Sequence, residues 1–168
     1  MDQHPAYLHS DVTSDINATA VAVHKELGPG FLEDIYEEAL CVEFDRRRIA
    51  YQRQLPVRVR YRGMPVGLYK LDLVINRKVV VEIKAVESIH EAHLSVALAY
   101  LKATGLAVGL IVNFAASVMR SRRVFRPSHW VNKEQEQKRT ASGAAEPHLT
   151  GDEGIEWRTC QNPSCAMV

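Results

Sequence analysis

Two carboxylates and one ammonium interrupt the most apolar stretch of this chain. The segment 71–85 reads LDLVINRKVVVEIKA, and outside its central turn at 76–78 the only charged residues are Asp72, Glu82 and Lys84. Apolar residues recur at every second position on both sides of the turn, which predicts a buried β-hairpin. Alternate residues of a strand share a face, so Glu82 and Lys84 project together. A three-residue turn then places Asp72 opposite Glu82, roughly 5 Å away.

This arrangement suggests a metal site. Two like charges at that separation repel each other unless a cation lies between them. Mg²⁺ prefers oxygen ligands and often takes one or two carboxylates and several waters. Asp72 and Glu82 can supply two ligands and the carbonyl of Ile83 a third, while Lys84 can orient a water or stabilise charge on a phosphate. These are the parts needed for metal-assisted hydrolysis of a phosphodiester.

The alternative is a plain ion pair at a strand end. In that case Glu82 and Lys84 face solvent, and Asp72 is an ordinary salt-bridge partner. We favour the metal site because the sequence around the pair, VVVEIKA, makes solvent exposure improbable.

Composition indicates a soluble globular protein. The chain has 168 residues, of which 46% are hydrophobic and 24% charged, enough for one domain with a core. No run approaches the ~20 apolar residues of a membrane span. The polar start, MDQHPAYLHSD, lacks a signal pattern, so we expect a cytoplasmic protein. A net charge of +1 permits nucleic-acid binding without arguing strongly for it.

Three regions differ in composition. We expect a flexible N-terminus over 1–13, a folded domain over 14–127 and a disordered tail over 128–168, which is rich in small and polar residues. Ser14 or Asp15 can cap the first helix. Periodicity within the domain predicts two helices, three strands, one helix and one strand, an α/β sandwich. The corresponding segments are 14–27, 31–48, 49–61, 68–75, 79–85, 87–104 and 106–114.

Two motifs carry a family resemblance. Asp72, followed ten residues later by Glu82-Ile83-Lys84, resembles the D…(D/E)-x-K signature of the PD-(D/E)XK nuclease superfamily. More narrowly, GFLEDIY at 30–36 resembles the motif of the GxxExxY protein family. The resemblance implies an αβββαβ restriction-endonuclease-like core, in which helices flank a mixed central sheet. It also implies a nuclease that hydrolyses DNA or RNA with Mg²⁺ or Mn²⁺.

The resemblance changes the interpretation of several residues. On local pattern alone, Glu33 compensates the dipole of the second helix; by analogy it joins Asp72 and Glu82 in holding the metal or its waters. Tyr36, one turn on, either packs or contacts a phosphate. His93 matches a family histidine that contacts substrate or packs. One departure is Val96, which stands where many relatives have a glutamine.

Arginines form two further groups. Arg58 and Arg60 share a face of one predicted strand, and a basic patch follows the last one. Such side chains either contact phosphates or simply form a solvated face, and the weak net charge favours the second interpretation. The patch consists of Arg120, Arg122, Arg123 and Arg126.

Two rivals to a nuclease remain. One is a catalytically silent nuclease fold that binds nucleic acid or protein; Val96 supports it, and the intact Asp72, Glu82 and Lys84 oppose it. The other is a structural protein without a metal. The sequence does not decide whether the substrate is DNA or RNA, or whether the protein is a monomer or a homodimer.

Overall fold

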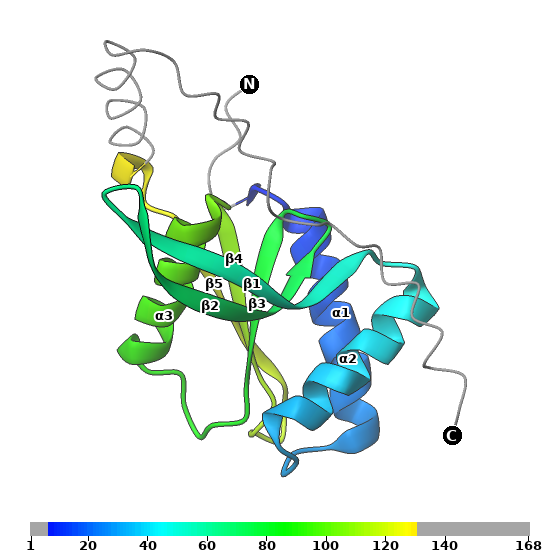
Figure 1. Ribbon diagram of the computed structural model, residues 1–168. Coiled ribbons are helices and arrows are strands. Elements are labelled where there is room, and N and C mark those ends of the chain that lie inside the picture. Colours follow the sequence, from blue (N-terminus) through cyan, green and yellow to red (C-terminus); the bar gives the residue numbers. More distant parts are fainter. Residues whose placement is uncertain (1–6, 131–168) are drawn as a thin grey trace.

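A five-stranded sheet separates two layers of helices in the computed structural model, which describes residues 7–130 (Figure 1). Helices α1 and α2 cover one face and α3 covers the other. The order along the chain is α1 (Ser10–Leu27), α2 (Glu33–Arg47), β1 (Tyr51–Tyr61), β2 (Met64–Ile75), β3 (Val79–Lys84), α3 (Glu91–Thr104), β4 (Val108–Asn113) and β5 (Arg120–Phe125).

The sheet is mixed, and its strands lie in sequence order from β1 to β5. All neighbours are antiparallel except β3 and β4, which are parallel and joined through α3. Ile75 pairs with Val79 across the β2–β3 turn, which confirms the predicted register. A parallel pair needs such a long crossover, so α3 must lie on one face of the sheet.

Two hydrophobic clusters form the core, one on each face. Leu73, Ile75 and Val81 pack in the cluster that contains α1 and α2. Val74 and Val80 pack in the cluster that contains α3. The central strands are thus buried on both faces, which explains their nearly continuous apolar sequence.

The first helix begins earlier than expected. It starts at Ser10, so residues 10–13 belong to α1, and Val12 is buried in the core. The cap position is His9, in place of the predicted Ser14 or Asp15. Burial of Val12 against the rest of the protein outweighs the local capping preference, as tertiary packing often does. Residues 131–168, most of the predicted tail, lie outside the described residues.

The sequence-based prediction also missed strand β5. The arginines from Arg120 to Arg123 suggested only a basic patch, yet this segment pairs antiparallel with β4 along its whole length. Val124 is its only buried residue, so the segment has no apolar alternation of its own. Backbone pairing with β4 decides its conformation. None of the helices among the described residues is long and apolar enough to span a membrane.

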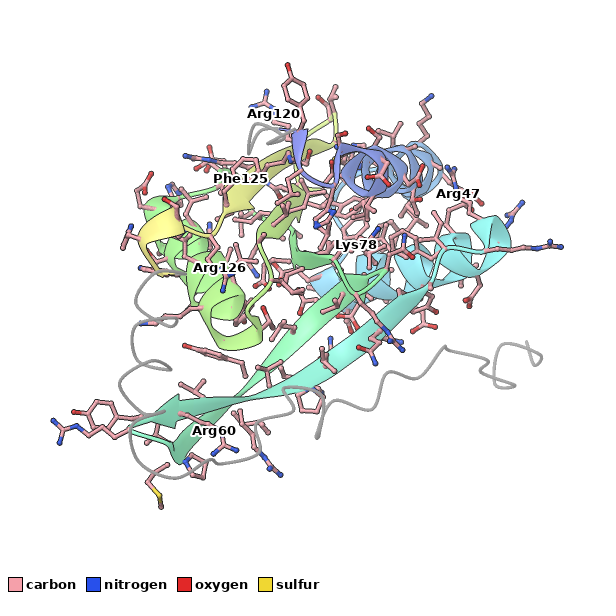
Figure 2. All side chains as sticks on the ribbon, turned by 90° about the horizontal axis from the view of Figure 1, so that it is seen from above. Arg47, Arg60, Lys78, Arg120, Phe125 and Arg126 are labelled. Carbon is pink, nitrogen blue, oxygen red and sulfur yellow. The ribbon has the colours of Figure 1, made fainter. Side chains whose placement is uncertain are left out.

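Strands β1 and β2 continue far beyond their neighbour. Pairing of β2 with β3 covers only Leu73 to Ile75, whereas β1 and β2 pair as far as Tyr61 and Met64. Residues 56–70 therefore form a two-stranded arm that extends past the end of β3, with Arg60 toward its tip (Figure 2). Strand β2 also begins four residues before the predicted start at Leu68.

Candidate active site

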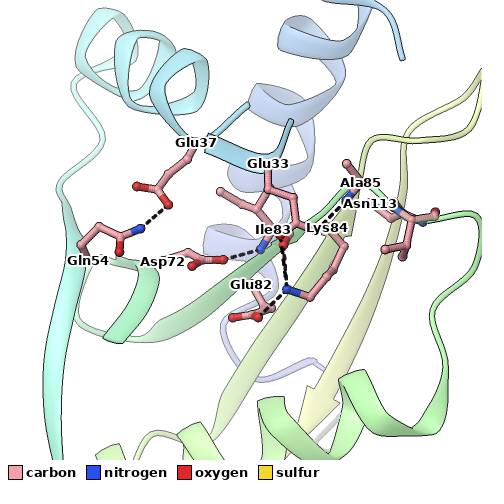
Figure 3. Close-up of polar contacts among 10 residues, drawn as sticks. Glu33, Glu37, Gln54, Asp72, Glu82, Ile83, Lys84, Ala85 and Asn113 are labelled. Carbon is pink, nitrogen blue, oxygen red and sulfur yellow. Dashed lines mark hydrogen bonds and ion pairs between the residues drawn. The ribbon is translucent and has the colours of Figure 1, made fainter. Parts of the chain in front are cut away.

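Three charged residues of the β2–β3 hairpin, Asp72, Glu82 and Lys84, meet at the C-terminal end of β3 (Figure 3). Lys84 Nζ donates hydrogen bonds to Glu82 Oε1 at 2.7 Å and to the carbonyl of Ile83 at 3.0 Å. Glu82 is buried and Lys84 is partly buried. The predicted pairing of Glu82 and Lys84 on one strand face is therefore present, and it is not an exposed surface pair.

Asp72 lies where β2 separates from β3. Regular pairing of these strands ends at Leu73 and Val81, and one position further the carboxylate of Asp72 accepts a hydrogen bond from the backbone N–H of Ile83 at 2.9 Å. The Asp72 side chain is thus hydrogen-bonded to the backbone of β3, at the residue next to Glu82. This contact fixes Asp72 beside Glu82 from a different strand.

The regular alternation of side chains in β1 and β2 is interrupted at Gln54 and Asp72. Leu71 and Leu73 are two residues apart but pack in clusters on opposite faces of the sheet. On the partner strand, Gln54 has φ 51°, in the left-handed region, and Gln54 and Asp72 are missing from the β1–β2 pairing. A positive φ is uncommon for a non-glycine residue, and such conformations gather at functional sites. The break re-aims the side chains at positions 54 and 72.

The surroundings of Asp72 raise the pKa of its carboxyl group. Burial, and next the negative charge of Glu82, raise the pKa of Asp72 to about 6. For Lys84, burial alone would lower the pKa, but the hydrogen bond to Glu82 and the surrounding carboxylates raise it above its ordinary value. Lys84 is therefore a permanent cation at neutral pH, suited to stabilising negative charge and unsuited to acting as a base.

Glu33 comes from the first turn of α2. Its Oε1 accepts a hydrogen bond from the N–H of Ala85 at 3.0 Å, and its Oε2 lies 3.8 Å from Lys84 Nζ. The structure thus brings Glu33 to the site, on the side of Lys84. Asn113, at the end of β4, holds the chain just beyond through hydrogen bonds with the backbone of Val86.

Two further residues at the site escaped the sequence analysis. Glu37 is one helical turn after Glu33, is buried, and bonds to Gln54 and Arg53 of β1. Tyr100 on α3 has its pKa raised to about 12, by burial and then by the charges of Glu82 and Asp72. The spacing of four between Glu33 and Glu37 was an available signal, because such residues share a helix face.

The remaining predicted residues lie elsewhere. Tyr36 is fully buried, stacks on Phe114, and donates to the carbonyl of Gly28, so its geometry supports packing and excludes phosphate contact. His93 Nδ1 accepts from the backbone N–H of His90 at the start of α3.

Val96 is exposed on α3, one turn before Tyr100. Arg58 and Arg60 are exposed on the arm, where Arg60 donates to the carbonyl of Gly63.

The donor set fits a divalent cation held by two carboxylates. Within residues 7–130, Glu82 Oε2 is buried without a hydrogen-bond partner, which is costly unless a cation or water satisfies it. Asp72, with its raised pKa, would also gain from a cation. In the same range, no three His, Cys, Asp or Glu side chains are grouped so that they could hold one ion. Mg²⁺ tolerates this, because waters commonly complete its octahedron.

Comparisons with known proteins assign the chain to a superfamily. A family model described as PD-(D/E)XK nuclease superfamily matches residues 10–125, so the chain belongs to that superfamily. The predicted αβββαβ restriction-endonuclease-like core is confirmed: it runs from α2 to β4, and α1 and β5 add to it. Nucleases of this superfamily typically use divalent metal ions. A search of the curated proteins found no match.

Two solved structures show a distant similarity to the chain. The crystal structure of SSO0001 is 15% identical, with a TM-score of 0.43, and the match covers 71% of this chain and 63% of that one. An alkaline exonuclease from Laribacter hongkongensis (LHK-Exo) is 11% identical, with a TM-score of 0.43, and the match covers 77% of this chain and 86% of that one. The chain thus spans less than two thirds of SSO0001.

Proposed function

We propose that this protein is a metal-dependent nuclease that hydrolyses phosphodiester bonds of DNA or RNA. The observation that supports this most directly is the cluster of Asp72, Glu82 and Lys84, in which a buried carboxylate oxygen of Glu82 has no hydrogen-bond partner among the described residues. Structural charge pairs normally satisfy their buried oxygens. A divalent cation held by Glu82 and Asp72 would satisfy this oxygen.

Each residue has a distinct role in this proposal. Asp72 and Glu82 would hold a divalent cation, Mg²⁺ or Mn²⁺, which would supply a nucleophile by lowering the pKa of a bound water. Glu33, whose Oε2 lies 3.8 Å from Lys84 Nζ, orients Lys84. Lys84, held as a cation, stabilises the negative charge that develops on the phosphate. The Ile83 carbonyl, which accepts a hydrogen bond from Lys84, would be a further oxygen available to the cation.

Cleavage of labelled nucleic acid tests the assignment. The purified chain should cut DNA or RNA with Mg²⁺ or Mn²⁺ and lose this activity in EDTA. Lys84→Ala should reduce the rate by about 100- to 1,000-fold, the usual effect of removing one electrostatic stabiliser, and Glu82→Gln should reduce it at least as much.

Lys78→Ala is the matched control, because Lys78 is exposed and lies just before the opposite end of β3. It should cleave like the wild type. Equal activity of the wild type and both site variants would overturn the site assignment.

The second candidate is a nuclease fold without turnover. Exposed Val96, in place of a polar side chain on α3, favours it. A metal that binds the native state raises the melting temperature. An increase with millimolar Mn²⁺ that disappears in Glu82→Gln supports the metal site, whereas the absence of any increase favours the silent module.

A narrower assignment, to the GxxExxY protein family, also stays a proposal. It is supported by the GFLEDIY segment at 30–36, in which Glu33 contacts the site and Tyr36 anchors the loop before α2. We propose that this motif works as one unit: the tyrosine fixes the start of the helix, and the helix positions the glutamate.

A further inference from the structure

We propose that the β1–β2 arm is a ribbon that binds the backbone of double-stranded nucleic acid and leads it to the site at the arm's base. This inference deepens the proposed function, because it names the substrate class and the surface that receives it. The arm comprises residues 56–70, and its charges, shape and position each support the assignment.

The charge of the arm is of one sign. Residues 56–70 contain four basic side chains and no acidic one, in a chain with a net charge of only +1. Pairing of Arg58 with Leu68 and of Pro56 with Lys70 places Arg58 and Lys70 on the same face of the arm. Both Arg58 and Lys70 are exposed there. An exposed face with only positive charge complements a phosphate backbone and opposes contact with a second copy of the same arm. The four basic residues are Arg58, Arg60, Arg62 and Lys70.

The shape favours a duplex over a single strand. A two-stranded β-ribbon fits the major groove of a duplex, which is about 12 Å wide. Single-strand binding relies on free aromatic platforms for stacking. Of the arm's two tyrosines, Tyr69 packs edge-on against Tyr100, and Tyr61, at the tip, is exposed with the Arg62 guanidinium 5.5 Å from its ring centre, so the arm offers a single free ring and no series of stacking platforms.

The position of the arm connects it to the site. Asp72 is two residues beyond Lys70 on the same strand, at the point where β2 leaves β3. At about 3.3 Å per residue, Lys70 lies about 7 Å along the strand from Asp72, and Arg58, opposite Leu68, about 13 Å. The basic end of the arm therefore lies, along the strand, within about two residues of one carboxylate of the candidate site.

Binding in EDTA tests the arm separately from catalysis. Fluorescence anisotropy would measure the Kd of the full chain for a labelled DNA duplex of about two helical turns. The triple variant Arg58→Gln, Arg60→Gln, Arg62→Gln should raise the Kd about 10- to 100-fold and lower the salt slope by about three. Replacing the same residues by lysine should restore the slope, because the charge is kept.

The matched control removes three exposed positive charges at other places. It combines Arg46→Gln and Arg48→Gln, at the C-terminal end of α2, with Lys78→Gln at the β2–β3 turn. Neighbouring Arg47 lies on the side of the molecule away from Arg60 (Figure 2). This control should bind within about twofold of the wild type, since its charges lie off the proposed path.

Three outcomes would overturn the arm proposal without affecting the proposed cleavage activity. The arm variant and the control could bind the duplex equally well, or the wild type could bind a single strand more tightly than the duplex. The wild type could also form a dimer that the arm substitutions dissociate. Conversely, arm-dependent duplex binding by a chain that never cleaves with Mg²⁺ or Mn²⁺ would support the arm and refute the proposed nuclease.

Discussion

The two halves of strand β2 share one backbone but have opposite surroundings. Residues 73–75 pair with β1 on one side and β3 on the other, and Leu71 pairs with β1. The apolar side chains of residues 71–75 are fully buried. Residues 64–70 pair only with β1, and all but Tyr69 are exposed. A charge in the buried half is costly unless it is compensated, so the position of Asp72 alone indicates a functional residue. Charges in the exposed half cost little, so Lys70 is informative only together with the other basic residues of the arm.

A matched pair of leucines gives the largest expected difference in stability. Leu73 is fully buried, whereas Leu68, on the same strand, is 65% exposed. Leu73→Ala should lower the free energy of unfolding by about 2–5 kcal/mol because it leaves a cavity in the core. Leu68→Ala should change it by less than about 0.5 kcal/mol. Urea denaturation measures both, and similar costs would refute the division of β2 into two halves.

Asp72 should make stability depend on pH in the unusual direction for a carboxylate. Its pKa is raised from 3.8 to about 6 in the folded protein, so the native state binds more protons than the unfolded state between these values. In EDTA, the stability that comes from this proton is present below pH 4 and is lost as the pH rises through 6.

Asp72→Asn removes this dependence. Relative to the wild type in EDTA, the variant should gain about 1–2 kcal/mol between pH 4 and pH 7, below the roughly 3 kcal/mol that two full pKa units would give. Adding Mg²⁺ at pH 7 should stabilise the wild type and leave the variant unchanged. A constant difference across this pH range would contradict the raised pKa.

The junction of the two halves should show an effect no larger than that of Asp72→Asn. Gln54 adopts a left-handed conformation opposite Asp72, where both strands break their pleat. Gln54→Val should lower the free energy of unfolding by about 1–2 kcal/mol more than Gln54→Asn, because asparagine tolerates positive φ and a β-branched residue does not. Urea denaturation again measures it, and equal costs would mean that the break stores no strain.

The local pattern was sufficient for much of the fold. Periodicity located all three flanking helices, and the three-residue turn fixed the pairing of Ile75 with Val79. These features depend on residues close in sequence. Pattern failed at β5, where pairing with β4 imposes a strand on a segment of arginines, and at α1, where burial of Val12 extends the helix.

The site divides in the same way. Strand alternation put Glu82 and Lys84 on one face, and turn length brought Asp72 near them, but the break in the pleat at Asp72 could not be predicted from local pattern. Tyr36 could not be assigned from its motif: only the structure places its ring on Phe114 and buries it completely. The contributions of Glu37 and Tyr100 depend on how α2 and α3 pack on the sheet, which no local pattern encodes.

By itself, the sequence determined that two acids and a lysine share a buried strand end, since a period of two and an apolar context require it. The tertiary structure decided the rest: that Glu33 reaches the site beside Lys84, that one oxygen of Glu82 has no partner among the described residues, and that half of β2 becomes a basic arm. The physical reason is that side-chain direction follows local backbone geometry, whereas burial, pairing and pKa depend on contacts between segments far apart in the chain.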